Sequence, residues 1–509
     1  MVQLREVLDR IEHCGLRGEI EPGPGQDIGM VTCDSREAAS GALFVAIRGY
    51  RTDGHRYIDA AIDAGVSVVV CEEFPDLCRP GCVYIRVADA RKALAEASRA
   101  VYGDASDRLM LIGVTGTNGK TTTARLITAM LNSCGIPAGY IGTGLCRIGD
   151  RDIEIDRTTP EAPGLHSLFR QMVDSGCRAA VMEVSSHSLV LKRVHGIMFH
   201  AGIFTNLSPE HLDFHDSMSA YAEAKKKMFS QLRPDGIAVV NADDPAAFFM
   251  VEHLPSDRVY CCSLADRASG CPPGNRFEAE IAETSVGGSR ALFMHDGRTV
   301  PVFVGLPGRF NVMNALEAFA LGIGLGIGAP AASAALAGEI RIDGRMERIW
   351  DRGGKRCAVV DYAHTPDALK KTLETLRQVK PKDGRLLVVF GCGGNRDRSK
   401  RPEMGRIASE YADCVILTSD NPRDEDPERI LDEIERGVTA TAYRRISDRE
   451  EAIRAAVREL VPGDLLLVAG KGHETYQEIA GEKRFFSDRH VLEECFLLPV
   501  TGTVQQEGV

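Results

Sequence analysis

The sequence has no apolar run that approaches the roughly 20 residues of a transmembrane helix, and it has no internal repeat or low-complexity tract. Its fifteen cysteines are scattered, with neither a CxxC pair nor zinc-finger spacing, and no signal peptide is recognisable. We therefore expect reduced thiols in a cytoplasmic protein rather than a disulfide scaffold. Basic residues are in deficit, with 61 Lys and Arg against 72 Asp and Glu, so the net charge is −11. This charge argues against nucleic acid or an anionic membrane as a partner.

What remains is the composition of a soluble globular protein, with 44% hydrophobic and 26% charged residues. A chain of 509 residues is too long for one core, so we expect about two to four domains. Short apolar runs alternate with helical segments, which predicts an α/β fold with parallel sheets. We place the domains at residues 1–106, 107–338 and 339–509.

The segment from Leu109 to Leu126 (LMLIGVTGTNGKTTTARL) joins a short apolar run, a Gly- and Asn-rich turn and a helix. A strand, such a turn, Lys-Thr and a helix are the arrangement of a phosphate-binding loop, in which backbone N–H groups approach a polyphosphate. Lys120 would reach the β- and γ-phosphates, and the Thr121 hydroxyl would bind Mg²⁺. The strict G-x-x-x-x-G-K-[ST] pattern requires glycine where this chain has Val114. The alternative interpretation is an ordinary turn between a strand and a helix.

Polar clusters follow the later predicted strands, at the strand ends where α/β proteins keep their sites. These clusters are Thr158–Pro160, Glu183–His187, Asn206–His215, Asp361–His364, Gly393–Asp397, Asp420–Arg423 and Lys471–Glu474. The DNPR segment alone would be a type I turn with proline at its second position. Four such ends in the last domain together predict a binding site.

Two features of the predicted helices have more than one interpretation. Asn311 and Asn314 lie one turn apart and could contact an adenine edge or cap the helix. The lysines at 225, 226 and 227 are consecutive, and for two of the three a solvated helix face is the simpler interpretation.

Nine motifs occur in a fixed order: GTNGKTT, EVSSH, HLDFH, YAEAKKKMF, GRMER, DYAHTPDAL, GCGGNRDRSKRPEMG, DNPR and GKGHE. Together they resemble the Mur ligases, and more closely the type that adds diaminopimelate. The resemblance covers nearly the whole chain, because DSREAASGALFVAIRG and DGHRYIDAAIDAG are similar to the family's N-terminal segments. It fades only after about Arg489. It implies a small α/β UDP-binding domain, a central P-loop ATPase-like domain with a parallel sheet, and a C-terminal Rossmann-like domain.

The resemblance also implies a reaction, in which ATP phosphorylates a substrate carboxylate and an amine attacks the acyl phosphate. The substrates would be UDP-N-acetylmuramoyl-L-alanyl-D-glutamate and meso-diaminopimelate, for peptidoglycan precursor synthesis. Phosphoryl transfer between anions requires neutralisation of charge. The implied catalytic residues are Lys120, Glu183, His211 and Lys225. Two Mg²⁺ ions are implied, held by Thr121, Glu183, His211 and a carbamate on Lys225, since a carbamate offers the oxygen ligands that Mg²⁺ prefers.

The resemblance assigns the remaining residues to three ligands. The ATP-binding set is Gly116, Thr117, Asn118, Gly119, Lys120, Thr121, Thr122, Asn311, Asn314 and Arg345. The UDP-substrate set is Cys33, Ser35, Thr158, Thr159, Ser185 and Arg193, with Tyr50–Thr52 in the same loop region. The diaminopimelate set is Arg396, Asp420, Asn421, Pro422, Arg423, Gly470 and Glu474. One departure is Leu191, where the family has glutamine two residues before the arginine.

Three alternatives stay open at this point. A lysine-adding relative is disfavoured by Arg423, because a guanidinium fits the second carboxylate of diaminopimelate and lysine has none. A folylpolyglutamate synthetase-like ligase is disfavoured by the DSR and DNPR segments. A non-catalytic relative should have lost residues such as Lys120 or Glu183, which are present. We expect small-molecule substrates only, no nucleic acid or membrane partner, and a monomer.

Overall fold

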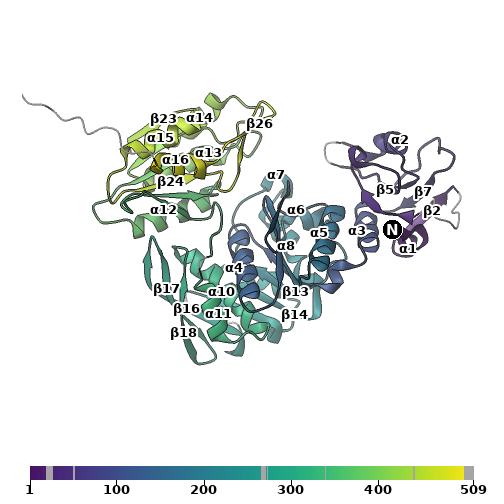
Figure 1. Cartoon of the computed structure of the whole chain (residues 1–509), viewed down its shortest axis with the longest axis horizontal. Coiled ribbons are helices and arrows are strands. Elements are labelled where there is room, and N and C mark those ends of the chain that lie inside the picture. The colour runs from purple at the N-terminus through teal and green to yellow at the C-terminus, as the bar shows by residue number, and fades with distance from the viewer. Residues whose placement is uncertain are drawn as a thin grey trace, which may run out of the picture. The chain divides into compact units, whose positions relative to one another are not determined.

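The computed structural model describes residues 1–18, 27–49, 52–264, 271, 273–338, 340–439 and 442–497 (Figure 1). They fall into two compact units. The first unit contains Met1–Leu207, His215–Arg276 and Glu317–Gly328, and the second contains Ser208–Phe214, Phe277–Leu316 and Ala329–Val509. Each unit is described by itself. No helix of the described residues is both long enough and apolar enough to span a bilayer.

The first unit begins with a sheet of strand order β2-β7-β6-β5-β4. Its strands are β2 (His13–Arg17), β4 (Met30–Thr32), β5 (Ala42–Val45), β6 (Val68–Cys71) and β7 (Val83–Val87), with a separate pair β1 (Val2–Gln3) and β3 (Asp27–Ile28). The accompanying helices are α1 (Leu4–Leu8), η2 (Ser35–Glu37), η3 (Gly54–Tyr57), α2 (Ile58–Asp63) and α3 (Ala90–Val101). Strands β4 to β7 are parallel and β2 is antiparallel. Alternate residues of β5 belong to two different core clusters, so both faces of the sheet are buried and the strand is apolar throughout.

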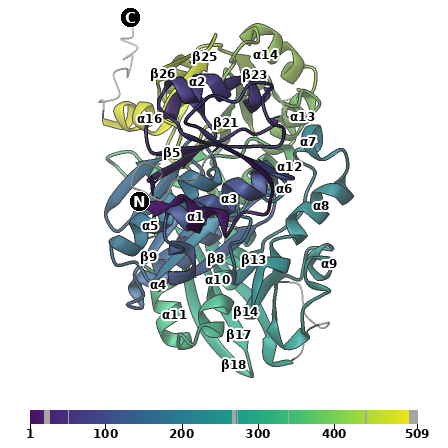
Figure 2. The same cartoon turned by 90° about the vertical axis from the view of Figure 1, so that its right-hand side faces the viewer.

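A second sheet of the first unit contains the predicted phosphate loop. Within this unit its strands follow the order β11-β10-β9-β12-β8-β13-β14-β15, and of the pairs among its described residues only β9–β10 and β10–β11 are antiparallel. Figure 2 labels β8, β9, β13 and β14 of this sheet. The strands are β8 (Met110–Thr115), β9 (Ala138–Gly142), β10 (Leu145–Ile148), β11 (Arg151–Glu154), β12 (Ala179–Glu183), β13 (Phe199–Phe204), β14 (Leu232–Asn241) and β15 (Val259–Ser263). The helices are η4 (Ala105–Arg108), α4 (Lys120–Ser133), α5 (Ala162–Asp174), α6 (Ser186–Val190), α8 (Met218–Lys226), η5 (Phe229–Gln231), α9 (Ala247–Val251), η6 (Ser256–Arg258) and η8 (Pro273–Asn275).

The register of this sheet brings three predicted polar segments to one edge. Strand β8 pairs in parallel with β12 on one side, with Glu183 opposite Val114. On its other side it pairs with β13, with Phe204 opposite Thr115. The phosphate loop after β8, the acidic end of β12 and the segment after β13 therefore start side by side, as expected for the carboxyl ends of parallel strands.

The second unit contains an antiparallel meander and a mixed sheet. The meander consists of β16 (Arg276–Ser285), β17 (Gly288–His295) and β18 (Arg298–Val304). The mixed sheet has the order β19-β20-β24-β21-β22-β23, from β19 (Glu347–Trp350), β20 (Cys357–Asp361), β21 (Leu386–Phe390), β22 (Cys414–Leu417), β23 (Ala442–Arg445) and β24 (Leu465–Ala469). Edge strand β19 is antiparallel, so the expectation of a purely parallel sheet is corrected there. Periodicity alone does not show strand direction.

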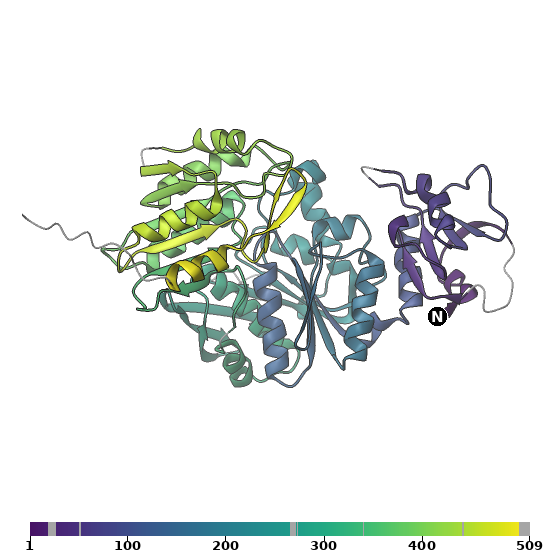
Figure 3. The same ribbon diagram turned by 45° about the horizontal axis from the view of Figure 1, so that its top comes forward.

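Helices lie along this mixed sheet (Figure 3). They are α12 (Pro366–Val379), α13 (Lys400–Tyr411), α14 (Pro427–Glu435), α15 (Arg449–Glu459) and α16 (Asp488–Leu497), with a hairpin of β25 (Tyr476–Ile479) and β26 (Glu482–Phe485). Residues of α15 and α16 share one core cluster with alternate residues of β20, β21 and β24. Helix α11 (Ala329–Leu336) precedes the sheet, while α7 (Leu212–His215) and α10 (Arg309–Gly324) are divided between the two units.

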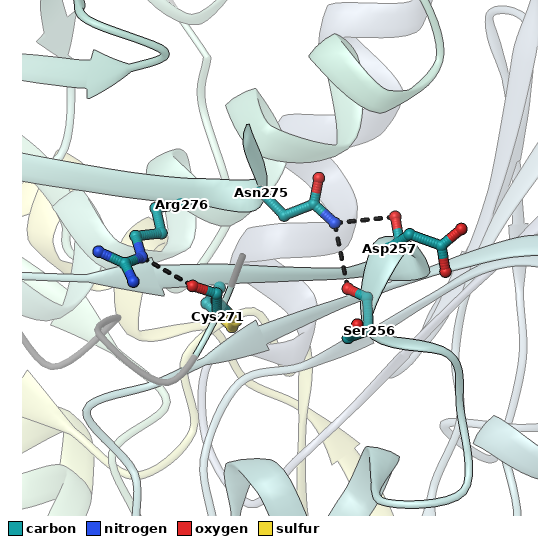
Figure 4. Close-up of a disulfide and its surroundings, with 6 residues drawn as sticks. Ser256, Asp257, Cys271, Asn275 and Arg276 are labelled. Carbon is teal, nitrogen blue, oxygen red and sulfur yellow. Dashed lines mark hydrogen bonds between the residues drawn. A yellow bond between two sulfur atoms is a disulfide. The ribbon is translucent and has the colours of Figure 1, made fainter. Parts of the chain in front are cut away.

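One pair of cysteines departs from the expectation of reduced thiols. Cys261 of β15 and Cys271 form a disulfide, with their Cα atoms 6.3 Å apart (Figure 4). Beside it, Arg276 Nε donates to the Cys271 carbonyl oxygen at 2.8 Å, and the Asn275 amide donates to the Ser256 and Asp257 carbonyl oxygens. The other thirteen cysteines are free thiols, so the chain is not a disulfide scaffold. Sequence spacing gave no signal for this pair, because the contact depends on the fold.

Candidate functional site

The loop between β8 and α4 has the backbone that phosphate binding requires. Gly116 has φ +147° and Gly119 has φ +88°, conformations that other residues rarely adopt. A Cβ atom on Gly116 would lie 1.9 Å from Thr205 Oγ1, so a side chain cannot be accommodated there. Helix α4 begins at Lys120, directly after Gly119. Its first N–H groups and its positive dipole end therefore face the loop, as an anion site requires.

Two lysine ammonium groups meet at this loop. Lys120 Nζ donates to the carbonyl oxygens of Gly116 and Thr117, at 3.0 and 2.7 Å. Lys225 Nζ from α8 donates to the same Gly116 oxygen at 2.7 Å and lies 4.3 Å from the centroid of the Tyr221 ring. Lys225 is only 1% exposed. Burial of a lysine is costly, so this one is positioned for a purpose that a solvated helix face does not explain.

The neighbouring lysines differ from Lys225. Lys226 forms an ion pair with Glu252, and Lys227 is exposed. Lys227 therefore fits the expectation of a solvated helix face, whereas the Lys226 side chain is only 17% exposed and Lys225 is buried, so that expectation holds for one of the two lysines it covered.

The carboxylate of Glu183, at the end of β12, is fully buried. Its Oε1 accepts hydrogen bonds from Thr121 Oγ1 at 2.8 Å, Tyr140 OH at 2.7 Å and Thr143 N at 3.0 Å. One carboxylate beside one hydroxyl is a set of hard oxygen donors that fits Mg²⁺, which usually takes its other ligands from phosphate and water. Among the described residues no group of three or more His, Cys, Asp or Glu side chains is arranged to hold a metal.

Four of the predicted UDP-substrate residues form one network with Glu183. Thr159 Oγ1 donates to the Glu183 carbonyl oxygen at 2.9 Å and lies 3.3 Å from Ser185 Oγ. Arg193 Nη1 donates to the Thr159 carbonyl oxygen at 3.0 Å. Thr158 Oγ1 lies 3.0 Å from Thr143 Oγ1. The structure thus brings these residues together beside the phosphate loop.

The remaining residues of that set lie near the first sheet. Burial, together with the nearby Glu161 carboxylate, raises the pKa of the Cys33 thiol to about 11, so Cys33 is a neutral thiol at pH 7. Ser35 begins the short helix η2, which Asp34 caps by accepting from Arg36 N. Of the predicted segment Tyr50–Thr52, Tyr50 and Arg51 lie outside the described residues.

His211 lies in the second unit, in the segment Ser208–Phe214, and has φ +57°. Its Nε2 is 3.7 Å from Glu210 Oε2, and Glu210 Oε1 is 3.5 Å from His364 Nε2. Within this unit His211 therefore belongs to a group of two imidazoles around one carboxylate. Its predicted metal role stays a prediction.

The predicted adenine-side residues also lie in the second unit. Asn311 Nδ2 donates to the Pro307 carbonyl oxygen at 2.8 Å, and Asn314 Nδ2 donates to Asn311 Oδ1 at 3.2 Å. Neither bond satisfies a free backbone N–H group of the helix start, so these contacts do not decide between the two interpretations of the pair. The Arg345 guanidinium lies over the Tyr362 ring, 4.6 Å from its centroid. Contact of all three with ATP stays a prediction.

The DNPR segment is held in a dense network at the ends of β22 and β24. Asn421 Nδ2 donates to Glu474 Oε2 at 2.9 Å, and Lys471 Nζ donates to Asn421 Oδ1 and Glu474 Oε2 at 2.9 and 3.0 Å. Gly470 has φ +114°, and a Cβ atom there would lie 2.6 Å from Asp420 Oδ2. The predicted residues Asp420, Asn421, Gly470 and Glu474 therefore do meet in one place.

Arg423 is held in an unusual backbone conformation beside this network. Its φ is +52°, and two backbone hydrogen bonds fix it to the hairpin, from Arg423 N to Glu478 O at 3.0 Å and from Ala480 N to Arg423 O at 2.7 Å. Its Nη1 donates to the Gly394 carbonyl oxygen at 2.8 Å, and its Nε lies 3.3 Å from Glu478 Oε2. Among the described residues, Nη2 of Arg423 has no such partner. Strain of this kind, about 1–3 kcal/mol, persists where the surroundings enforce it.

Arg396 is the second guanidinium of this region. A Cβ atom on Gly393 would lie 3.0 Å from Arg423 Nη1 and 3.7 Å from Arg396 Cγ, so Gly393 separates the two arginines at close range. Arg396 is exposed and makes no hydrogen bond or ion pair to any described residue. The Arg423 guanidinium and the stem of the Arg396 side chain thus both lie beside Gly393, and their available donors suit the carboxylate of a ligand.

Several residues of these networks were not assigned a role from the sequence. Tyr140 and Thr143 bond Glu183 from the far side of the loop, and Lys471 and Glu478 bond the DNPR segment. Asn206 Oδ1 accepts a hydrogen bond from Asn118 N at 3.0 Å and so fixes the phosphate loop. Lys471 and Asn206 lie in polar clusters at strand ends, which was an available signal. Tyr140, Thr143 and Glu478 had none.

A buried carboxyl group lies under the first turn of α4. Glu317, in the part of α10 that belongs to the first unit, is 0% exposed, and its Oε2 accepts from Thr123 Oγ1 at 3.0 Å. Its Oε1 has no hydrogen-bond partner within the described part of the chain. Burial raises the pKa of Glu317 to about 8, so the folded protein holds this group as the neutral acid at pH 7.

The raised pKa predicts a stability that falls with rising pH. Above about pH 4.5 the unfolded chain releases the Glu317 proton while the folded chain keeps it until about pH 8. The stabilisation that protonated Glu317 contributes to the folded state is therefore fully present below pH 4.5 and is lost as the pH rises to 8. Relative to Glu317→Gln, the parent should lose about 2–4 kcal/mol of unfolding free energy between pH 5 and pH 8.

Thermal unfolding of the parent and of Glu317→Gln across this pH range measures the difference. The exposed Glu154→Gln is the matched control and should show no trend. A difference between parent and Glu317→Gln that stays constant with pH would contradict a neutral Glu317.

Comparison with known proteins gives three family matches along the chain. The models described as "Mur ligase family, catalytic domain", "Mur ligase middle domain" and "Mur ligase, glutamate ligase domain" match residues 27–102, 114–322 and 344–472. A protein of Chlorobaculum tepidum named UDP-N-acetylmuramoyl-L-alanyl-D-glutamate--2,6-diaminopimelate ligase is 64% identical over 92% of each chain. A protein of the same name from Geobacter metallireducens is 42% identical over 91% of this chain and 93% of its own.

Solved structures agree with these matches. A structure of a UDP-N-acetylmuramoyl-L-alanyl-D-glutamate--2,6-diaminopimelate ligase is 33% identical, with a TM-score of 0.66 over 94% of this chain and 96% of its own. A folylpolyglutamate synthase of Thermotoga maritima is 16% identical, with a TM-score of 0.57 over 75% of this chain and 89% of its own, which shows a shared fold only. The expected three-domain α/β architecture is confirmed.

Proposed function

This chain belongs to the Mur ligase family, and from that premise we propose that it is the ATP-dependent ligase that adds meso-diaminopimelate to UDP-N-acetylmuramoyl-L-alanyl-D-glutamate. The product is a peptidoglycan precursor. Support comes from the relatives of that name that are 64% and 58% identical over 92% and 95% of this chain. The observation that supports the chemistry most directly is the buried Thr121–Glu183 pair, 2.8 Å apart, at the start of the phosphate-loop helix.

The first chemical step is phosphoryl transfer from ATP to the D-glutamate carboxylate. Both reactants are anions, so the loop must concentrate positive charge where the phosphoryl group passes. The Lys120 ammonium and the N–H groups at the start of α4 supply fixed positive charge there. Mg²⁺, when bound by Thr121 and Glu183, supplies further charge neutralisation. A carbamate on Lys225 would supply oxygen ligands for a second Mg²⁺.

The second step is attack by the amine of the incoming amino acid. Meso-diaminopimelate carries a carboxylate and an ammonium at its distal end, which lysine does not match. The Arg423 guanidinium, oriented by Gly394 and Glu478, offers Nη2 to that carboxylate. The Glu474 carboxylate, already fixed by Asn421 and Lys471, offers its other oxygen to the ammonium.

Replacing Arg423 by alanine should lower kcat/KM for meso-diaminopimelate by about thirtyfold or more, because a charge-assisted contact of about 2 kcal/mol or more is lost. The KM for ATP should stay within twofold of the parent. Good use of lysine should not appear, since removal of a charge supplies no new contact. Steady-state kinetics of Arg423→Ala beside the exposed control Arg429→Ala measures this. A kcat/KM for diaminopimelate within threefold of the parent would contradict the assignment of Arg423.

The activity as a whole is tested by phosphate release from ATP in the presence of the UDP-muramoyl dipeptide and each amino acid in turn. Release should require both the UDP-linked substrate and meso-diaminopimelate. Release with L-lysine instead would favour the lysine-adding alternative, release with a folate substrate and glutamate would favour a folylpolyglutamate synthetase, and no release at all would favour a non-catalytic relative. We further propose that the protein is cytoplasmic, has small-molecule partners only and is a monomer. Sedimentation of the purified protein tests the oligomeric state.

A further inference from the structure

Three arginines of the first unit converge on the carboxylate of Glu161, the residue that precedes α5. Arg157 donates to Oε1, Arg193 Nε lies 2.9 Å from the same oxygen, and Arg91 Nη1 of α3 lies 3.9 Å from Oε2. The three come from separate segments of the chain, the helix after the first sheet and the loops before α5 and after α6. The fold therefore assembles this cluster, and no local sequence pattern produces it.

The charges of the cluster do not balance. Three guanidinium groups face one carboxylate, in a chain whose net charge is −11. Burial lowers the pKa of Arg193, Glu161 opposes this shift, and Arg157 and Arg91 lower the pKa further. The Arg193 and Arg91 side chains are 10% and 22% exposed, so water screens their mutual repulsion less than it screens that of the half-exposed Arg157. A second anion would relieve the repulsion.

The hydrogen bonds of the cluster are also incomplete. Arg193 Nε is close to Glu161 but has no aligned hydrogen-bond acceptor among the described residues. Arg91 Nη1 makes a long bond of 3.5 Å to the carbonyl oxygen of Leu191, whose side chain offers no polar group. Glu161 occupies the N-cap position of α5, yet its side chain makes no capping bond to that helix. The Glu161 carboxylate therefore interacts with the arginines and does not cap the helix.

We propose that Arg91, Arg157 and Arg193 form an anion-binding subsite, which Glu161 fills in this structure and which a phosphate or carboxylate group of the UDP-linked substrate enters by displacing it. The subsite adjoins two residues predicted to bind that substrate. Arg193 Nη1 donates to the Thr159 carbonyl oxygen at 3.0 Å, and Glu161 lies close enough to Cys33 to raise the pKa of its thiol. The inference rests on the proposed function for the identity of the ligand. It assigns Arg91 and Arg157 to substrate binding and makes Glu161 an internal competitor.

The two sides of the subsite predict opposite effects. Arg91→Ala removes a cation from the ligand, so the KM for the UDP-muramoyl dipeptide should rise about tenfold or more. Glu161→Gln removes the competing carboxylate at nearly constant volume, so the same KM should fall. The KM for ATP should stay within twofold in both variants. The exposed Arg170→Ala on α5 is the matched control, and thermal unfolding of each variant confirms that it is folded.

A purely structural ion-pair cluster would give a different result, because loss of either partner would then weaken binding in the same direction. A KM for the dipeptide within twofold of the parent in Arg91→Ala overturns the proposal. So does a KM that rises in a folded Glu161→Gln. If Glu161→Gln does not fold, Arg91→Ala alone decides.

Calorimetric titration separates the two sources of the anion. UDP offers the diphosphate without the peptide, and the muramoyl dipeptide without UDP offers the carboxylates. A loss of affinity in Arg91→Ala for UDP assigns the subsite to the diphosphate, a loss for the muramoyl dipeptide assigns it to a carboxylate, and a loss for neither overturns it. A parent enzyme that shows no turnover would refute the proposed function instead, so the two failures are distinguishable.

Discussion

Alanine in place of Lys120 should lower kcat at least a hundredfold. The Lys120 ammonium lies within the phosphate loop, 3.0 and 2.7 Å from the Gly116 and Thr117 carbonyl oxygens. Loss of one preorganised positive charge where negative charge develops typically costs about 3 kcal/mol or more, which corresponds to about a hundredfold in rate. Rates of phosphate release at saturating substrates measure the effect.

The exposed Lys227→Ala is the control for Lys120→Ala and should retain parental rates. Turnover of Lys120→Ala within a few-fold of the parent would mean that the strand–turn–helix segment is an ordinary turn. That interpretation was open in the sequence because Val114 stands in place of the pattern's first glycine.

Alanine in place of Lys225 should abolish turnover almost completely, and a short carboxylic acid in the buffer should restore part of it. Lys225 is 1% exposed and its Nζ lies 2.7 Å from the Gly116 carbonyl oxygen, so its end group lies at the phosphate loop. We expect a carbamate on this nitrogen, which converts a cation into oxygen donors for Mg²⁺. A free carboxylic acid can replace those oxygens in the space that alanine leaves.

Intact-mass measurement under bicarbonate and high-resolution density should both show the carbamate on Lys225. The neighbouring Lys226→Ala and Lys227→Ala variants are matched controls, since Lys226 pairs with Glu252 and Lys227 is exposed. Full activity of Lys225→Ala with both neighbours intact would show that the chosen lysine, or the carbamate chemistry, is wrong.

The sequence predicted those parts of the site that depend on local structure. The phosphate loop was recognisable because Gly116, Gly119 and Lys120 lie within five residues of one another, between an apolar run and a helix. The polar segments at strand ends were predicted to meet because parallel strands place their carboxyl ends at one edge. The register of β8 with β12 and β13 confirms that expectation.

Contacts between distant segments could not be predicted in this way. The hairpin that holds Arg423 at φ +52° lies more than fifty residues further along the chain, and Arg91 is separated from Leu191 by one hundred positions. Neither of these two contacts is indicated by a hydrophobic periodicity or by a sequence motif. The disulfide between Cys261 and Cys271 and the antiparallel edge strand β19 were also missed, although their partners are near in sequence, because no motif marks either of them. Both the disulfide and the direction of β19 depend on the three-dimensional arrangement of the strands, which no local sequence pattern predicts.

The most direct test of the proposed function is kcat/KM of the parent enzyme for meso-diaminopimelate and for L-lysine, measured with the UDP-muramoyl dipeptide and ATP saturating. Bound lysine would leave the Arg423 guanidinium without its carboxylate, which costs about 2–5 kcal/mol for a desolvated charge. We therefore predict that diaminopimelate is preferred by a factor of about a hundred or more. Equal values, or a preference for lysine, would contradict the substrate assignment.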